Sequence, residues 1–83
     1  MGREVLANFW ADEGTVSGTK TVRFPWRSRR MTVTNDSSSA SMTVSLSGNS
    51  FTLKPTESLS VKYWATEVTL QGSGVAYRVW IFG

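Results

Sequence analysis

Between Met31 and Ile81 apolar and polar side chains alternate in short runs, which Ser, Gly and Pro interrupt. Successive side chains of a β-strand point to opposite faces, so each run predicts a strand with one apolar face. No stretch has apolar residues at the i, i+3, i+4 and i+7 positions of an amphipathic helix. The pattern predicts an all-β protein: a small antiparallel β-sandwich, jelly-roll-like, with roughly seven or eight strands and no helix of consequence.

The expected strands lie between residues that favour turns. Asn35 to Ser39 and Lys54 to Glu57 predict turns, because Asn, Asp and Ser side chains bond nearby backbone and Pro55 presets its φ angle. Residues 11–18, with two acidic residues and two glycines, predict a loop. The strands expected are 5–10 (a strand or a docking arm), 20–24, 31–34, 42–46, 51–53, 59–63, 68–70 and 75–82.

A first hairpin is expected around Gly48-Asn49, a two-residue turn signal with glycine where positive φ is needed. This turn would place Leu46 opposite Phe51 and Val44 opposite Leu53. All four apolar side chains would then share one face of the hairpin.

A second hairpin is expected around Gly72-Ser73. It would place Leu70 opposite Val75 on the apolar face and Glu67 opposite Arg78 on the other. Opposite charges at facing positions of two strands favour that register.

The length predicts a single domain over residues 1–83, in which residues 1–19 form part of the sandwich or an N-terminal arm or edge strand. A domain this small buries only about 60% of its unfolded surface, and without cysteine it has no disulfide to support it. Four Trp, four Phe and two Tyr exceed what such a core can hide. We therefore expect a homo-oligomer, made in a cytosol, because no signal-peptide pattern or membrane-length apolar run is present.

The residue types available argue against catalysis. The chain has no histidine and no cysteine, so it lacks the commonest general base and the usual zinc ligands. We expect no enzyme, no metal and no cofactor. A carboxylate hydrolase, the least favoured alternative, would need one cleft holding two of these residues: Asp12, Glu13, Asp36, Glu57 and Glu67.

Aromatic residues and arginines are the expected binding groups. If Tyr77 and Val79 face the core, Trp80 and Phe82 point outward beside Arg78, as anchors of a protein interface do. The alternative is a second sheet layer that makes Trp80 part of the core. The full set of expected interface residues is Phe9, Trp10, Phe24, Trp26, Arg27, Arg29, Arg30, Trp64, Arg78, Trp80 and Phe82.

A basic cluster of Arg23, Arg27, Arg29 and Arg30 surrounds Phe24-Pro25-Trp26. Aromatic rings beside arginines stack on single-stranded nucleic acid, and tryptophan also stacks on sugars. The other interpretation is an edge strand whose aromatics cap the core while the arginines are solvated or contact protein. This cluster supports the alternative function of a carbohydrate- or nucleic-acid-binding β module.

Four segments resemble small β-rich modules of tailed-bacteriophage virion proteins: TNDS at 34–37, MTVSLSG at 42–48, FTLKPTE at 51–57 and LQGSGVAYRVW at 70–80. Those modules occur in head-decoration, head-fibre, adaptor and tail proteins and often have glycine where this chain has Thr56. The resemblance implies a non-enzymatic virion structural protein, either a capsid decoration or cement protein or a head-tail component. It would assemble with itself, dock on other virion proteins and reside in the virion after synthesis in the host cytoplasm.

Overall fold

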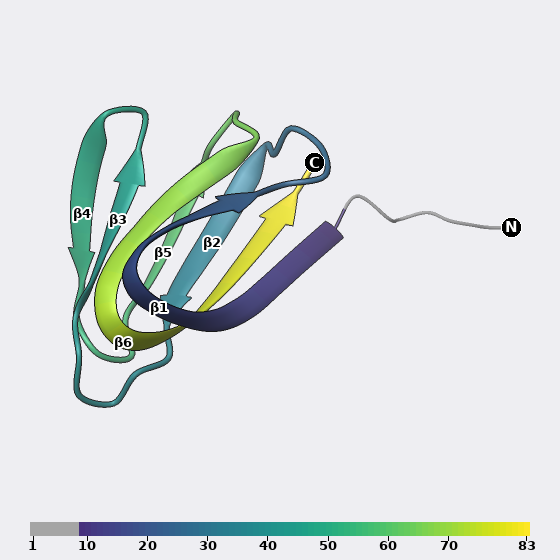
Figure 1. Cartoon of the computed structure of the whole chain (residues 1–83). Helices are drawn as coiled ribbons and strands as arrows, with labels where there is room; N and C mark the ends of the chain where they lie inside the picture. Colours follow the sequence, from purple (N-terminus) through teal and green to yellow (C-terminus); the bar gives the residue numbers. More distant parts are fainter. Residues whose placement is uncertain (1–8) are drawn as a thin grey trace, which may run out of the picture.

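The computed structural model describes residues 9–83, which form six antiparallel strands and no helix (Figure 1). The expected all-β fold class is confirmed. Six strands replace the expected eight segments, because residues 9–10 and 20–23 belong to one strand and 68–70 and 75–82 to another. The strands are β1 (Phe9–Arg23), β2 (Arg30–Asn35), β3 (Met42–Leu46), β4 (Asn49–Leu53), β5 (Ser58–Lys62) and β6 (Glu67–Phe82).

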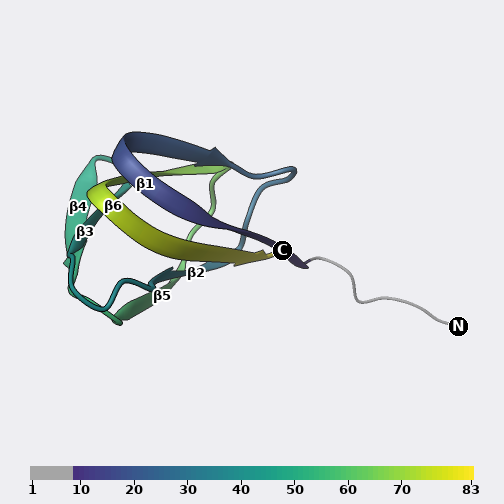
Figure 2. The same cartoon turned by 60° about the horizontal axis from the view of Figure 1, so that its bottom comes forward.

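The long strand β6 organises the sheet, whose order is β4-β3-β6-β2-β5 with β1 on the other edge of β6. Along its second edge β6 pairs with β3 at residues 69–71 and with β2 at residues 77–82. The ribbon of β1 and β6 therefore spans both halves of the sheet. In Figure 2, β1 and β6 arch over β2 and β5, while β3 and β4 close one end. This curled arrangement is the β-sandwich.

The bend in the β1–β6 ribbon coincides with a β-bulge. Val16 pairs with Val75 and Ser17 pairs with Ser73, so Gly74 has no partner on β1. Gly74 has a φ of 65°, a value at which glycine avoids the steric cost of a side chain. Residues 11–18, expected as a loop, are part of β1, and the bend lies within them.

The hairpin expected at Gly72-Ser73 is wrong, because β6 runs through both residues without turning. Leu70 pairs with Lys20 and Val44 instead of Val75. A one-residue bulge inverts the inward and outward alternation of a strand just as a two-residue turn does, so the sequence pattern fits both.

The expected pair of Glu67 and Arg78 is likewise absent. Glu67 lies 3.1 Å from Arg23 on β1, with which it is in register. Arg78 forms two hydrogen bonds to the Asp36 carboxylate, of 2.7 and 3.0 Å.

The hairpin of β3 and β4 has a different turn from the one expected. Its central residues are Ser47 and Gly48, whose φ values of 49° and 83° are the left-handed values that a primed turn requires. Val44 consequently pairs with Phe51 rather than with Leu53, which pairs with Met42. The register changes by an even number of residues, so the apolar side chains stay on the expected face.

The two expected turns are confirmed. Asn35, fully buried, donates from Nδ2 to the carbonyls of Ala40 (2.8 Å) and Leu53 (3.0 Å), and its Oδ1 accepts from the Ser37 amide (2.9 Å). The Glu57 amide donates to the Lys54 carbonyl over 3.0 Å, which closes the second turn.

The apolar core lies inside the curled sheet. Inward-facing residues of β1, β2, β3, β4 and β6 form it together with Phe24, and the partly buried Leu59 and Val61 of β5 pack against it. Its members are Val16, Val22, Phe24, Met31, Val33, Met42, Val44, Leu46, Leu53, Val68, Leu70, Val75, Tyr77, Val79 and Ile81. Residues 9–83 contain no helix long and apolar enough to span a membrane.

Candidate ligand site

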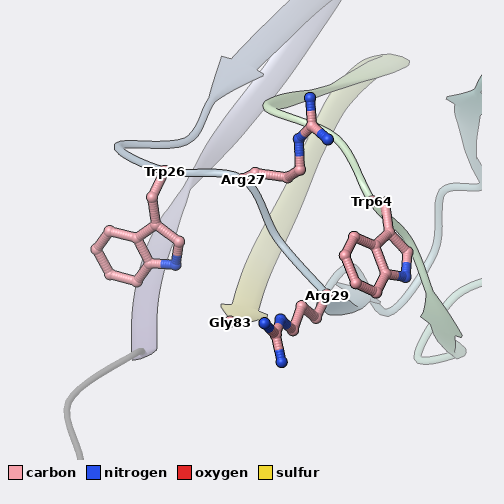
Figure 3. A pocket seen from close by; sticks show the side chains of 5 residues that line it. All are labelled: Trp26, Arg27, Arg29, Trp64 and Gly83. Carbon is pink, nitrogen blue, oxygen red and sulfur yellow. The ribbon is translucent and has the colours of Figure 1, made fainter.

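A hollow of about 370 Å³ lies at the end of the sheet where β6 finishes (Figure 3). Figure 3 shows the two indoles on opposite sides of this hollow and the two arginines between them. Its volume falls in the range of about 300–1,000 Å³ that small-ligand sites occupy. We call it the Trp26–Trp64 hollow; it is lined by Trp26, Arg27, Arg29, Trp64 and Gly83.

Two chain connections bring these side chains together: residues 24–29 between β1 and β2, and residues 63–66 between β5 and β6. Ser28 joins the connections, because its amide donates to the Ala65 carbonyl over 2.8 Å and its hydroxyl donates to the carbonyls of Ala65 and Tyr63. Ser28 is fully buried. The backbone that carries the arginines and Trp64 is therefore fixed by hydrogen bonds.

Further backbone bonds hold the same region to the end of β6. The Arg29 amide donates to the Phe82 carbonyl over 2.7 Å, and the Arg29 carbonyl accepts from Tyr63 over 3.1 Å. A ligand in the hollow would therefore meet a largely preformed backbone, which lowers the entropic cost of binding.

Gly83 makes a close approach that a larger residue would prevent. A Cβ atom there would lie 2.8 Å from the Arg27 carbonyl oxygen and 3.2 Å from Trp26 Nε1. The same Nε1 is buried and has no hydrogen-bond partner among residues 9–83. Gly83 thus packs directly against the Trp26 ring, which holds that ring at the wall of the hollow.

The charged side chains that line the hollow are both arginines. The Arg29 guanidinium carbon lies 5.4 Å from the centre of the Trp64 ring, a cation–π arrangement. Within residues 9–83 the salt bridges use Arg23 and Arg78 and leave Arg27 and Arg29 without a carboxylate. A guanidinium stays protonated and an indole does not titrate near neutral pH. These side chains can therefore bind an anion and stack on a planar ring, but they cannot accept a proton.

Of the expected interface residues, the structure brings Trp26, Arg27, Arg29 and Trp64 together. Phe24 is only 8% exposed and belongs to the core, so it offers no surface anchor. Trp10 is half-buried against it, with ring centres 5.9 Å apart. The remaining expected interface residues lie on the outer surface of β1, β6 and β2: Phe9, Arg30, Arg78, Trp80 and Phe82.

Trp80 and Phe82 do point outward, as the alternation predicted, with 37% and 38% of their surface exposed. Arg78 lies beside Trp80, its guanidinium carbon 5.6 Å from the ring centre. The alternative that placed Trp80 in the core is wrong. Sequence reasoning missed that Gly83 packs on Trp26, since no local pattern links residues this far apart.

The carboxylates that a hydrolase would need are mostly engaged in structural bonds. Asp12 accepts from the Tyr77 hydroxyl, Asp36 from Arg78, and Glu57 from the Lys54 amide. Asp12 and Glu13 adjoin one small hollow, but as consecutive strand residues they point to opposite faces of β1. Glu13 and Asp36 line another hollow of about 330 Å³, where Arg78 holds the Asp36 carboxylate in a salt bridge. No three His, Cys, Asp or Glu residues within 9–83 are grouped to hold a metal ion.

Comparison with known proteins identifies a fold relationship only. No family model matches the sequence, and no curated protein matches it. Among solved structures, the crystal structure of a cupin-2 domain-containing protein from Shewanella frigidimarina NCIMB 400 superimposes with a TM-score of 0.58 and 9% sequence identity. The match covers 94% of this chain and 72% of the other. The protein is thus a small jelly-roll-like β-domain with a cupin-like fold.

This likeness contradicts the function expected from the phage resemblance. The structural neighbour is a cupin-2 domain-containing protein, which points away from a virion protein. The expected function as a capsid decoration, cement or head-tail component is therefore wrong. Residues 42–48 and 51–57 resemble segments of virion modules because they are short strands and turns, which many β-domains share.

Proposed function

We propose that this chain is a non-enzymatic binding module that holds single-stranded nucleic acid in the Trp26–Trp64 hollow. The observation that carries the proposal is the set of side chains at this one site: two tryptophans flank two arginines, and no lining side chain is acidic. A nucleotide combines a planar base with an anionic phosphate, so it uses both kinds of side chain at once.

Stacking is the first part of the recognition. Trp64 is 64% exposed, so a large part of its ring is open to a base. Base stacking on an aromatic side chain contributes about 1–3 kcal/mol per base and tolerates any sequence. Because a base must be unstacked to reach an indole, the ligand is a single strand rather than a duplex.

Charge is the second part and distinguishes nucleic acid from sugar. Arg27 and Arg29 are exposed, and the salt bridges of Glu67 and Asp36 lie outside the hollow. A neutral oligosaccharide would stack on the tryptophans but make no use of two cations. The net charge of +3 favours an anionic ligand as well.

The test is a fluorescence-anisotropy titration of a labelled single-stranded oligothymidylate with the whole chain at two salt concentrations. We expect binding that weakens as salt rises. Arg27→Gln and Arg29→Gln should each make the slope of log affinity against log salt shallower by about 0.7. Trp64→Ala should weaken binding by roughly 5- to 150-fold at either salt concentration.

Phe51→Ala is the matched control, because Phe51 is an exposed aromatic on β4, outside the hollow. Its affinity should equal that of the unaltered chain. A neutral oligosaccharide, followed by tryptophan fluorescence, should not compete with the DNA. Binding of the oligosaccharide alone, or DNA binding that survives all three substitutions in the hollow, would overturn the proposal.

A further inference from the structure

The outer surface of β1, β6 and β2 carries a second set of exposed aromatic residues, away from the hollow. We call it the Trp80 face. Phe9, Trp80 and Phe82 are 52%, 37% and 38% exposed, and the rings of Phe9 and Phe82 lie 5.3 Å apart. Exposed aromatics gathered on one face are typical of a surface that a partner covers.

Strand register places two opposite charges symmetrically about Trp80. Trp80 pairs with Ala11 on one side and Thr32 on the other. Glu13 lies on β1, two residues after Ala11, and Arg30 lies on β2, two residues before Thr32. Because both strands run antiparallel to β6, the two charges lie on diagonally opposite sides of Trp80. With strands about 4.8 Å apart and about 3.4 Å per residue, each charge lies about 8 Å from Trp80.

We propose that a second copy of this chain covers the Trp80 face around a two-fold axis through Trp80. A two-fold interface is self-complementary, so each contact occurs twice. An axis that lies between the two faces, at right angles to the line from Glu13 to Arg30, places Glu13 of each copy opposite Arg30 of the other. The two tryptophans then meet at the centre.

The same operation provides a place for an aromatic ring. Beside Trp80 lies a hollow of about 170 Å³, lined by Ala11, Asp12, Glu13 and Trp80. Rotation about the axis carries Phe82 of the second copy over Ala11, whose small side chain leaves that space open. One symmetry operation thus produces both the contact of Phe82 with Ala11 and the ion pair of Glu13 with Arg30. For this reason a second copy fits this face.

The size of the contact sets its strength. The line from Glu13 to Arg30 spans only about 16 Å, and stable complexes cover about 800 Å² on each partner. We therefore expect a weak dimer that forms at high micromolar concentration. This proposal concerns a different surface from the Trp26–Trp64 hollow and stands independently of nucleic-acid binding.

Sedimentation equilibrium of the whole chain, over a concentration series and without nucleic acid, tests the proposal. The average mass should rise from 9.2 kDa towards twice that value. Glu13→Arg and Arg30→Glu should each weaken self-association by about tenfold, because each places like charges together twice. The double variant Glu13→Arg/Arg30→Glu should associate more tightly than either single variant, since the exchanged charges remain complementary across the axis. Its affinity should stay below that of the unaltered chain, because Glu13 is in register with Arg78, which repels an arginine at that position.

Trp80→Ser should abolish self-association, whereas Phe51→Ser, at an exposed aromatic on β4, should leave it unchanged. Circular dichroism confirms that each variant is folded. A mass that stays at 9.2 kDa at every concentration would overturn the proposal, and so would a double variant no better than the single ones. Loss of association in Phe51→Ser but not in Trp80→Ser would assign the interface to another surface.

Discussion

The Tyr77 hydroxyl donates a hydrogen bond of 2.8 Å to Asp12 Oδ2 across the β1–β6 ribbon. Lys20 lies on the other side of the bend in β1, opposite the bulge at Gly74 of β6, and its Nζ is 5.4 Å from the centre of the Tyr77 ring. Tyr77 therefore contacts β1 on both sides of its bend. Gly14 leaves room for it, since a Cβ there would lie 3.2 Å from the Tyr77 hydroxyl oxygen.

Tyr77→Phe should lower the free energy of unfolding by about 2 kcal/mol, because it removes a hydrogen bond to a charged acceptor. Urea denaturation measures the change. Tyr63→Phe is the control: it removes a bond from the Tyr63 hydroxyl to the neutral Glu67 carbonyl and should cost about 1 kcal/mol. A loss in Tyr77→Phe no larger than in Tyr63→Phe would contradict a special role for the bond to Asp12.

Stability should fall at alkaline pH. Burial raises the pKa of Tyr77 above its ordinary value of 10.0, and the hydrogen bond with Tyr77 raises the pKa of Lys20 above 10.5. Folding therefore favours the protonated form of both groups, so their contribution is complete below about pH 10 and is lost as pH rises through the folded-state pKa values. Urea denaturation at increasing pH should show this loss, and Tyr77→Phe should reduce it. An equal loss in the variant would refute the assignment.

Asn35→Ala should destabilise the chain by about 3 kcal/mol. The substitution leaves the buried Leu53 carbonyl, the partly buried Ala40 carbonyl and the Ser37 amide without their partner in the turn after β2. Thermal or urea unfolding gives the value. Asn49→Ala, at an exposed position of β4, should change stability by less than about 0.5 kcal/mol. Similar effects for the two variants would show that the turn does not depend on the Asn35 side chain.

Thr56→Gly should stabilise the protein by about 0.5 kcal/mol. Thr56 has a φ of 70°, which costs a residue with a side chain about 1–2 kcal/mol, more than the entropy that glycine adds to the unfolded chain. Thr52→Gly, in the exposed part of β4, should destabilise instead. Urea denaturation gives the change in the free energy of unfolding for both variants. A loss of stability in Thr56→Gly would contradict backbone strain at this turn.

The alternation of apolar residues was enough to predict the fold class and the outward direction of Trp80, and turn-favouring residues were enough to predict the confirmed turns. It was not enough to predict which strands pair. The acidic residues and glycines of residues 11–18 indicate a loop, but here they form half of a strand that reaches β6, about 60 residues later in the chain. At Gly74 a bulge and a hairpin leave the same local pattern, so only long-range pairing distinguishes them.

The candidate site shows the same limit. The sequence alone predicts Trp26, Arg27 and Arg29 as binding residues, because they form one cluster of arginines and an aromatic residue in the chain. It also marked Trp64, but gave no reason to place it opposite Trp26. That placement depends on Ser28, which bonds the two connections together and has no distinctive local signal.

The proposed function is tested most directly by the indole N–H signals of the four tryptophans in a nitrogen-15 NMR spectrum. During titration with a single-stranded oligothymidylate at constant protein concentration, the signals of Trp26 and Trp64 should shift in a saturable way. The signals of Trp10 and Trp80 should stay in place. Signals of Trp26 and Trp64 that do not move at saturating oligonucleotide would contradict nucleic-acid binding in the hollow.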